Sequence, residues 1–236
     1  MVQLIKNNDQ LQDVLIDKRI GFVPTMGALH EGHMSLVQES AKRGLFTVVS
    51  IFVNPTQFNN KEDFELYPTN LERDVVMLEN IGGDVVYAPQ KDQIYPKDLV
   101  MEVYDYEFQS VDSVLEGKYR PGHFKGVAQV VHRLFEIVKP QYAFFGEKDY
   151  QQLAIIRLLC KKLSLPIGII GMPTIREKSG LAMSSRNERL SEVQKDKATL
   201  LYKSLCHAAE NFATKQPQEI KDLSLIHISE PTRQSP

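Results

Sequence analysis

Short apolar runs bounded by turn residues alternate with longer amphipathic segments along most of the chain. The apolar runs are Ile20–Pro24, Thr47–Val53, Asp84–Ala88, Tyr142–Phe145 and Ile167–Met172. Runs of this length are typical of strands buried on both faces. The segments between them predict helices at His33–Arg43, Asn70–Asn80, Val127–Val138 and Tyr150–Leu163. This alternation predicts an α/β fold with a Rossmann-like, doubly wound parallel sheet.

The pattern changes after Met172. A polar loop, PTIREKSGLAMSSRN, is followed by one further helical segment from about Ser191 to Ala213. We therefore expect a Rossmann-like domain over residues 1–173 and a small α+β domain that starts at residue 174. The segment Lys91–Glu116 has no glycine and no helical stripe, and it predicts an excursion beside the sheet.

Composition narrows the class of protein. Lys and Arg number 28 against 30 Asp and Glu, so a net charge of −2 offers no basic field for nucleic acid. Two cysteines, Cys160 and Cys206, are too few for a disulfide framework or a thiolate zinc site. The first 20 residues lack a continuous signal-peptide core, and no stretch approaches the length of a membrane span. We expect a cytoplasmic protein that binds small molecules.

The loop PTMGALHEGH, from Pro24 to His33, lies between a predicted strand and the start of a helix. Ligands of doubly wound sheets bind beyond the carboxyl ends of the strands. Unpaired backbone amides of the loop and the positive end of the helix dipole are expected to attract an anion. Gly27 and Gly32 permit a close backbone approach, while His30 and His33 add hydrogen-bond donors. The loop predicts a phosphate site, although a single histidine near a helix start is often only a cap. A zinc-protease motif is excluded because its histidines are four residues apart, not three.

Two further loops follow predicted strands. VNPTQFNNKEDFELYP offers the neutral amides of Asn54 and Gln57 and the hydroxyl of Tyr67, which suit hydroxyl and carboxylate groups. Asn-Pro is also an ordinary turn signal, so this loop alone leaves both interpretations open. GEKDYQQ places Lys148 at a helix start, where a cation is unfavourable unless an anion lies nearby. Phosphate contact is the favoured interpretation of Lys148.

Basic residues recur in two glycine-containing segments. GKYRPGHFKGV couples Arg120, His123 and Lys125 with flexible glycines ahead of a helix, and a plain basic loop is the alternative interpretation. AMSSRN, over Ala182–Asn187, presents two hydroxyls and a guanidinium after Gly180. Such groups suit the grip on a triphosphate as pyrophosphate leaves, though the motif alone is weakly specific.

Together these motifs resemble a known family. HEGH and MSSR are similar to the HIGH and KMSKS signatures of the nucleotidyltransferase superfamily. The ordered set FVPTMGALHEGH, FVNPTQF, YRPGHFKGV, FFGEKDYQQ and PTIREKSGLAMSSRN resembles the pantothenate synthetase family from about residue 1 to residue 215. Five motifs in order are far more specific than any one of them.

The resemblance implies roles for individual residues. It implies catalytic roles for His33 as proton donor and for His30, Lys148 and Arg186. It implies ATP contacts at Met26, Gly27, Ala28, Leu29, His30, Glu31, Gly32, His33, Gly146, Glu147, Lys148, Asp149, Ile175, Met183, Ser184, Ser185 and Arg186. It implies pantoate contacts at Gln57 and Gln152, and Gln57 is also linked to β-alanine. Asn54, Tyr67 and Arg120 complete the expected substrate-binding set, and Asp74 matches a carboxylate linked to magnesium.

The implied reaction has two steps in one site. Pantoate is activated by ATP as an acyl adenylate in the presence of magnesium, and the β-alanine amine then displaces AMP. Positioning and electrostatics would carry the catalysis, which fits the lack of a nucleophilic triad in the motifs. Members of the family are usually homodimers. They also run longer than this chain, so we expect a partial C-terminal domain over residues 174–223. Residues 224–236 read like translated vector sequence.

Two alternatives remain open. Another nucleotidyltransferase could share the HEGH loop, but it would need added cations for a substrate phosphate, whereas Gln57 and Gln152 are neutral. A nucleotide-binding regulator without turnover is the alternative from a different class of protein. ATP consumption that depends on both pantoate and β-alanine would exclude it.

Overall fold

The computed structural model describes residues 2–97, 108 and 110–222. The chain divides into two compact units, Met1–Thr174 and Ile175–Pro236. The vector-like segment 224–236 lies outside the described residues, as does much of the segment 91–116. Each unit is considered separately below.

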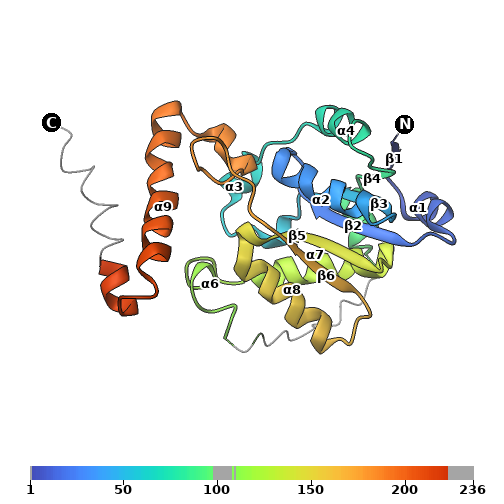
Figure 1. Ribbon diagram of the computed structural model, residues 1–236. Coiled ribbons are helices and arrows are strands. Elements are labelled where there is room, and N and C mark those ends of the chain that lie inside the picture. The colour runs from blue at the N-terminus through green and yellow to red at the C-terminus, as the bar shows by residue number, and fades with distance from the viewer. Residues whose placement is uncertain (1, 98–107, 109, 223–236) are drawn as a thin grey trace. The chain divides into compact units, whose positions relative to one another are not determined.

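Within the described residues of the first unit, six parallel strands form one sheet (Figure 1). They are β1 (Gln3–Ile5), β2 (Ile20–Thr25), β3 (Phe46–Ile51), β4 (Val85–Tyr87), β5 (Tyr142–Gly146) and β6 (Gly168–Met172). Their order across the sheet is β1-β4-β3-β2-β5-β6. The chain therefore runs outward from β2 to β3 and β4, then returns to place β5 on the other side of β2. The predicted doubly wound parallel sheet is confirmed.

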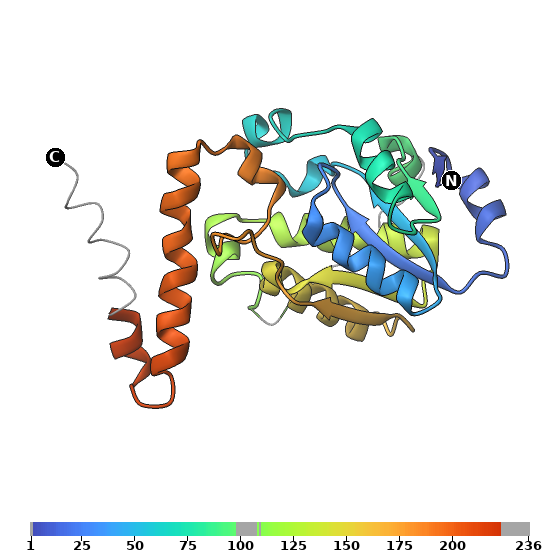
Figure 2. The same cartoon turned by 45° about the horizontal axis from the view of Figure 1, so that its top comes forward.

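Helices cover both faces of this sheet, as Figures 1 and 2 show from two directions. The helices of the first unit are α1 (Asn8–Leu15), α2 (Glu31–Lys42), α3 (Lys61–Glu65), α4 (Leu71–Glu79), α5 (Lys91–Ile94), α6 (Glu116–Tyr119), α7 (His123–Val138) and α8 (Tyr150–Lys162), with two short 3₁₀ turns, η1 (Pro55–Gln57) and η2 (Glu147–Asp149). Alternate strand residues enter different cores: Phe22 packs with residues of α1, α7 and α8, whereas Val23 packs with residues of α2 and α4.

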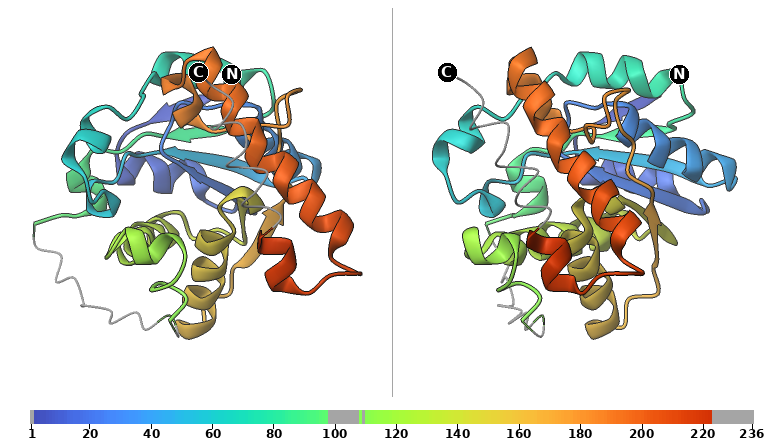
Figure 3. Two further views of the ribbon diagram at one scale, coloured as in Figure 1. Left: turned by 90° about the vertical axis from the view of Figure 1, so that its left-hand side faces the viewer. Right: turned by 60° about the vertical axis from the view of Figure 1, so that its left-hand side comes forward.

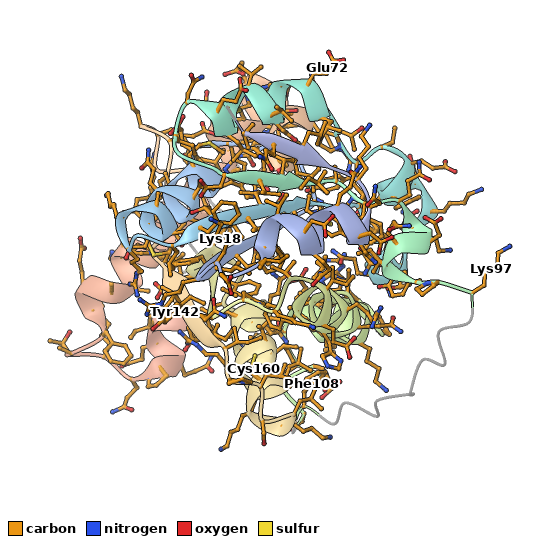
Figure 4. The ribbon with its side chains drawn as sticks, turned by 90° about the vertical axis from the view of Figure 1, so that its right-hand side faces the viewer. Lys18, Glu72, Lys97, Phe108, Tyr142 and Cys160 are labelled. Carbon is orange, nitrogen blue, oxygen red and sulfur yellow. The ribbon has the colours of Figure 1, made fainter. Side chains whose placement is uncertain are left out.

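Helices α7 and α8 contact each other (Figure 3). Both contribute buried residues to the core on their side of the sheet. Phe22 and Phe135 meet edge to face, with ring centroids 6.2 Å apart. Cys160 and Phe108 are buried in the same core, and both are labelled in Figure 4. Burial raises the pKa of the Cys160 thiol to about 11, which suits a packing residue rather than a reactive thiol.

The sequence pattern missed the first strand and the first helix. β1 has three residues and only Ile5 is buried, so it carries almost no alternating signal. α1 is an eight-residue helix that buries Leu11 and Leu15 and is capped by the Asn7 side chain. Elements this short show too few repeats for periodicity to identify them.

The described part of the second unit contains a hairpin-like turn, the 3₁₀ turn η3 (Ser185–Arg189), the long helix α9 (Glu192–Asn211) and a further helical stretch over residues 217–222. An isolated antiparallel bridge joins Arg176 to Ala182. Ser191 caps α9 in a capping box with Gln194, which explains where the helix begins. No helix among the described residues combines the length and apolar character that crossing a membrane requires.

Candidate active site

The loops richest in chemistry follow β2 and β5, the two strands between which the strand order reverses. In doubly wound sheets the ligand crevice lies beyond the carboxyl ends of the strands at this switch point. The histidine loop, residues 24–33, begins in the last two residues of β2, and the GEKD segment, residues 146–149, begins at the last residue of β5. The fold therefore brings together two loops that are more than a hundred residues apart in sequence.

The histidine loop ends in a cap built from its own two imidazoles. His30 is the N-cap of α2, and its Nδ1 accepts a hydrogen bond of 3.1 Å from the Gly32 amide. His33 Nδ1 accepts one of 3.3 Å from the His30 amide. The ring centroids lie 4.1 Å apart. Because both Nδ1 atoms accept, a neutral ring carries its proton on Nε2 in each case, where it can be donated to a ligand.

The protonation state of His33 is set by its surroundings. Burial, the neighbouring His30 ring and the Lys148 ammonium lower the pKa of His33 to about 3. His33 is therefore neutral at pH 7 in the ligand-free protein, and it acts as a hydrogen-bond donor rather than as an imidazolium acid. The influence of Lys148 also indicates that the loops after β2 and β5 lie within electrostatic reach of each other.

Most backbone amides of the histidine loop already have partners. The Gly27 amide donates to Thr25 Oγ1, and the amides of Ala28 and Leu29 donate to the Asp74 carboxylate. The amides of residues 30, 32 and 33 are used within the cap. The expectation that unpaired loop amides would hold phosphate therefore needs correction. The groups suited to meet a nucleotide are the imidazole Nε2–H donors, the cation of Lys148 and the amide of Glu31 at the helix start.

The loop after β3 packs against the histidine loop. Gln57 is buried, and its Nε2 lies 3.0 Å from the Met26 sulfur. Asn54, only 1% exposed, bonds through Nδ2 to Gln57 Oε1 and to the Gly126 carbonyl, and its Oδ1 accepts from the Tyr95 hydroxyl. Asn54 thus has a structural task, which is to hold the amide of Gln57 in place.

Helix α7 supports the same loop from behind. A Cβ at Gly126 would lie 2.5 Å from the Thr56 carbonyl oxygen, so only glycine permits this approach. His123 is buried and its Nδ1 lies 2.7 Å from the Gln57 carbonyl oxygen. Arg120 bonds to His123 Nε2 and forms an ion pair with Glu116. The GHFKGV motif therefore positions the Gln57 backbone.

The remaining expected residues of the first unit are distributed as follows. Tyr67 is 9% exposed and its ring packs edge-on against Phe58. Lys148 lies in η2 and pairs with Asp149 at 2.9 Å. Gln152 lies in the first turn of α8 and is half-buried, whereas its neighbour Gln151 bonds to the carbonyls of Val111 and Val114.

In the second unit, the expected ATP contacts lie on one hairpin. The Met183 amide donates to the Ile175 carbonyl at 3.0 Å, so these two residues are neighbours despite their separation in sequence. Ser184 is the N-cap of η3 and accepts from the Arg186 amide, and Ser185 is buried. Arg176 lies 4.0 Å from the Tyr202 ring centroid, which fixes the hairpin to α9.

A magnesium site built from protein side chains does not fit the described residues. They contain no cluster of three His, Cys, Asp or Glu side chains suited to a metal ion. Asp74, the expected ligand, is 0% exposed and turns one oxygen to the Ala28 amide and the other to the Leu29 amide. Magnesium usually keeps several waters and is reached by open carboxylates and substrate phosphates.

Three supporting residues were not predicted as site residues from the sequence. Tyr95 belongs to the unassigned segment 91–116, and Thr25 is the last residue of β2. Gln151 was overlooked because Gln152 beside it matched the motif. Tyr95 and Gln151 act through hydrogen bonds to residues distant in sequence, and Thr25 bonds to the Ser50 carbonyl as well as to the Gly27 amide. No local pattern signals the contacts with distant residues.

Comparison with known proteins agrees with this geometry. The sequence profile of the family described as pantoate-beta-alanine ligase matches residues 3–234. The chain belongs to this family. The pantothenate synthetase of Flavobacterium psychrophilum is 49% identical over 211 residues, covering 89% of this chain and 73% of its own length.

Solved structures of the family are also similar. The pantothenate synthetase of Thermus thermophilus superposes with a TM-score of 0.90 at 41% identity, covering 96% of this chain and 82% of that one. The pantoate-beta-alanine ligase of Francisella tularensis, complexed with beta-gamma ATP and β-alanine, gives a TM-score of 0.81 at 37% identity, covering 94% and 86%. Family membership excludes the alternative of another nucleotidyltransferase class.

Proposed function

We propose that the chain joins pantoate to β-alanine at the expense of ATP, by way of a pantoyl adenylate. A pantoate carboxylate oxygen attacks the α-phosphorus, and the bond between that phosphorus and the bridging oxygen breaks, so that pyrophosphate leaves with the electron pair. The β-alanine amine then attacks the acyl carbonyl, AMP leaves, and the amine proton passes to solvent. The observation that carries this proposal is the pairing of the histidine loop with Lys148 at the switch point of a sheet of this family.

The charges of the site residues indicate which of them meet the phosphates of ATP and which meet pantoate. His30 and His33 donate from neutral Nε2–H groups and Lys148 adds a cation, so these residues stabilise charge on the phosphates. Gln57 and Gln152 are neutral amides that suit the hydroxyl and carboxylate groups of pantoate. Ile175 and the segment 183–186 take part in ATP binding, and Arg186 stabilises the departing pyrophosphate. Tyr67 and Arg120 support the substrate side of the site.

Magnesium would be held by the ATP phosphates and water, where it would neutralise phosphate charge. The buried Asp74 carboxylate faces backbone amides, so it is not available as a ligand for this ion. We also propose a homodimer that works in the cytoplasm, where ATP is available.

The test is a coupled assay of AMP release in which each substrate is omitted in turn. AMP and pyrophosphate should form in equal amounts only when ATP, pantoate and β-alanine are all present at steady state. Stoichiometric ADP, or ATP hydrolysis that ignores pantoate, would contradict the proposal.

A further inference from the structure

A carboxylate lies buried beneath the histidine loop. Asp74 is 0% exposed; its Oδ2 accepts a hydrogen bond of 2.9 Å from the Ala28 amide, and its Oδ1 accepts one of 2.8 Å from the Leu29 amide. Successive backbone amides of this kind form a concavity that binds anions. Here the anion is a side chain of the protein itself, so the concavity is closed to the phosphates of a nucleotide.

The turn above this carboxylate is strained. Gly27 has φ +85° and Ala28 has φ +49°, and the second value is unfavourable for a residue with a side chain. A Cβ on Gly27 would lie 3.0 Å from the Ile51 side chain and 3.1 Å from Asp74 Oδ2. Such backbone persists only where surrounding contacts hold it. The two hydrogen bonds that the amides of Ala28 and Leu29 donate to Asp74 are contacts of this type, directly before the His30 cap.

The carboxylate is itself held in place by the helix that carries it. Asp74 is the fourth residue of α4, which begins after the N-cap Asn70. Leu78 on the same helix is 0% exposed and belongs to the core beneath α2, with Val75 and Met77 packed against it. Movement of the carboxylate would therefore require movement of a packed helix.

We propose that Asp74 is a positioning residue that fixes the turn at Gly27–Ala28, and with it the imidazoles of His30 and His33, instead of a ligand for magnesium. The proposal rests on the proposed function for its kinetic consequence, because the imidazoles must meet ATP. The anchoring contact itself can be tested without any nucleotide.

The variant Asp74→Asn keeps the shape of the side chain but turns an NH₂ group toward one backbone N–H. The turn should then be correct in a smaller fraction of molecules, and apparent ATP affinity falls in proportion to that fraction. If the fraction is one tenth, the KM for ATP rises roughly tenfold while kcat stays within about threefold, because saturating ATP restores the turn. A general loss of folded protein would lower kcat and leave KM unchanged.

Glu72→Gln is the matched control. It removes the same charge from the same helix, but Glu72 is exposed and its side chain points away from the molecule in Figure 4. Its KM for ATP should equal that of the parent chain. An equal rise in both variants would mean that charge alone is responsible, and it would overturn the positioning role.

The dependence of ATP affinity on Mg²⁺ distinguishes a positioning role of Asp74 from a role as a metal ligand. Dissociation constants for ATP are measured by calorimetry with EDTA and with excess Mg²⁺. The loss of affinity in Asp74→Asn should be the same factor in both conditions. A loss confined to the Mg²⁺ condition would identify Asp74 as a metal ligand.

Amide hydrogen exchange tests the anchor without ATP. The amides of Ala28 and Leu29 should be protected in the parent chain and should exchange at least tenfold faster in Asp74→Asn, with the strands unchanged. Unchanged exchange would overturn the proposal even if ATP binding is lost. Conversely, a parent chain that does not bind ATP would refute the proposed function and leave this result standing.

If Asp74→Asn does not fold, an experiment on the parent chain alone still tests whether Asp74 binds a metal ion. Substoichiometric Mn²⁺, added without nucleotide, should leave the NMR signals of the Ala28 and Leu29 amides sharp while both amides stay protected. Selective broadening of these two signals would show a metal ion at Asp74 and would overturn the proposal.

Discussion

The two segments to which we assign ATP binding are held by different means. The histidine loop is fixed by a carboxylate some 45 residues further along the chain, on another helix. The hairpin that carries Met183–Arg186 has hydrogen bonds of its own over residues 175–187, together with the contact of Arg176 with Tyr202. A distant buried anchor gives a preorganised site, whereas local contacts on a short hairpin open at lower cost.

The largest effect on the reaction rate is expected at the preorganised histidine loop and the neighbouring Lys148. His33→Ala and Lys148→Ala should each slow pantoyl adenylate formation by roughly 100-fold, the usual cost of losing a fixed transition-state donor. Single-turnover measurement of the adenylate checks this. Lys161→Ala is the control, because Lys161 is an exposed cation in the last turn of α8. Its rate of adenylate formation should be close to that of the parent chain. Near-normal rates in the first two variants would remove them from the catalytic set.

A smaller effect is expected for pantoate recognition. Gln57→Ala and Gln152→Ala should weaken pantoate binding roughly 10- to 100-fold, because a buried substrate group loses its partner. Gln57→Ala should also weaken ATP binding slightly, since its amide contacts Met26, whereas Gln152→Ala should not. Calorimetric titrations with each ligand distinguish the two. The exposed Gln10, changed to Ala, is the control. Equal losses for ATP and pantoate would contradict the assignment.

The locally held hairpin should respond more mildly. Arg176→Met removes the cation above Tyr202, a contact worth about 0.5–2 kcal/mol. Exchange of the amides in residues 175–186 should rise, and the KM for ATP should increase a few-fold without change at Ala28 and Leu29. Lys178→Met, in the exposed turn of the same hairpin, should do neither. A similar increase at Ala28 and Leu29 would show that the two segments are not independently held.

The smallest expected change is in a titration. Because burial holds the pKa of His33 near 3, well below its usual 6.5, the folded protein should show no protonation of His33 between pH 8 and pH 5. Unfolded in urea, the same histidine should titrate near its ordinary pKa. The unfolded state then binds more protons below pH 6.5, so this residue lowers stability as pH falls toward 3. NMR of the imidazole checks this; a midpoint near 6.5 in the folded protein would contradict it.

The sequence pattern predicted features formed by neighbouring residues and missed contacts between residues far apart in the chain. Buried strands, the histidine loop before a helix and Lys148 at a helix start each leave a pattern within about ten residues. The anchoring of that loop by Asp74 leaves none, because an acidic residue on a helix is usually solvated. For the same reason the roles of Asn54 and His123 in holding Gln57 emerged only when η1 and α7 were seen in contact. No sequence pattern indicated that side chains accept hydrogen bonds from the amides of the histidine loop.

The most direct test of the adenylate mechanism is exchange of labelled pyrophosphate into ATP. With pantoate present and β-alanine absent, the first step should run in both directions and transfer the label into ATP. We expect exchange that requires pantoate and that falls roughly 100-fold in His33→Ala. Ligation without any exchange, or exchange that proceeds without pantoate, would contradict it.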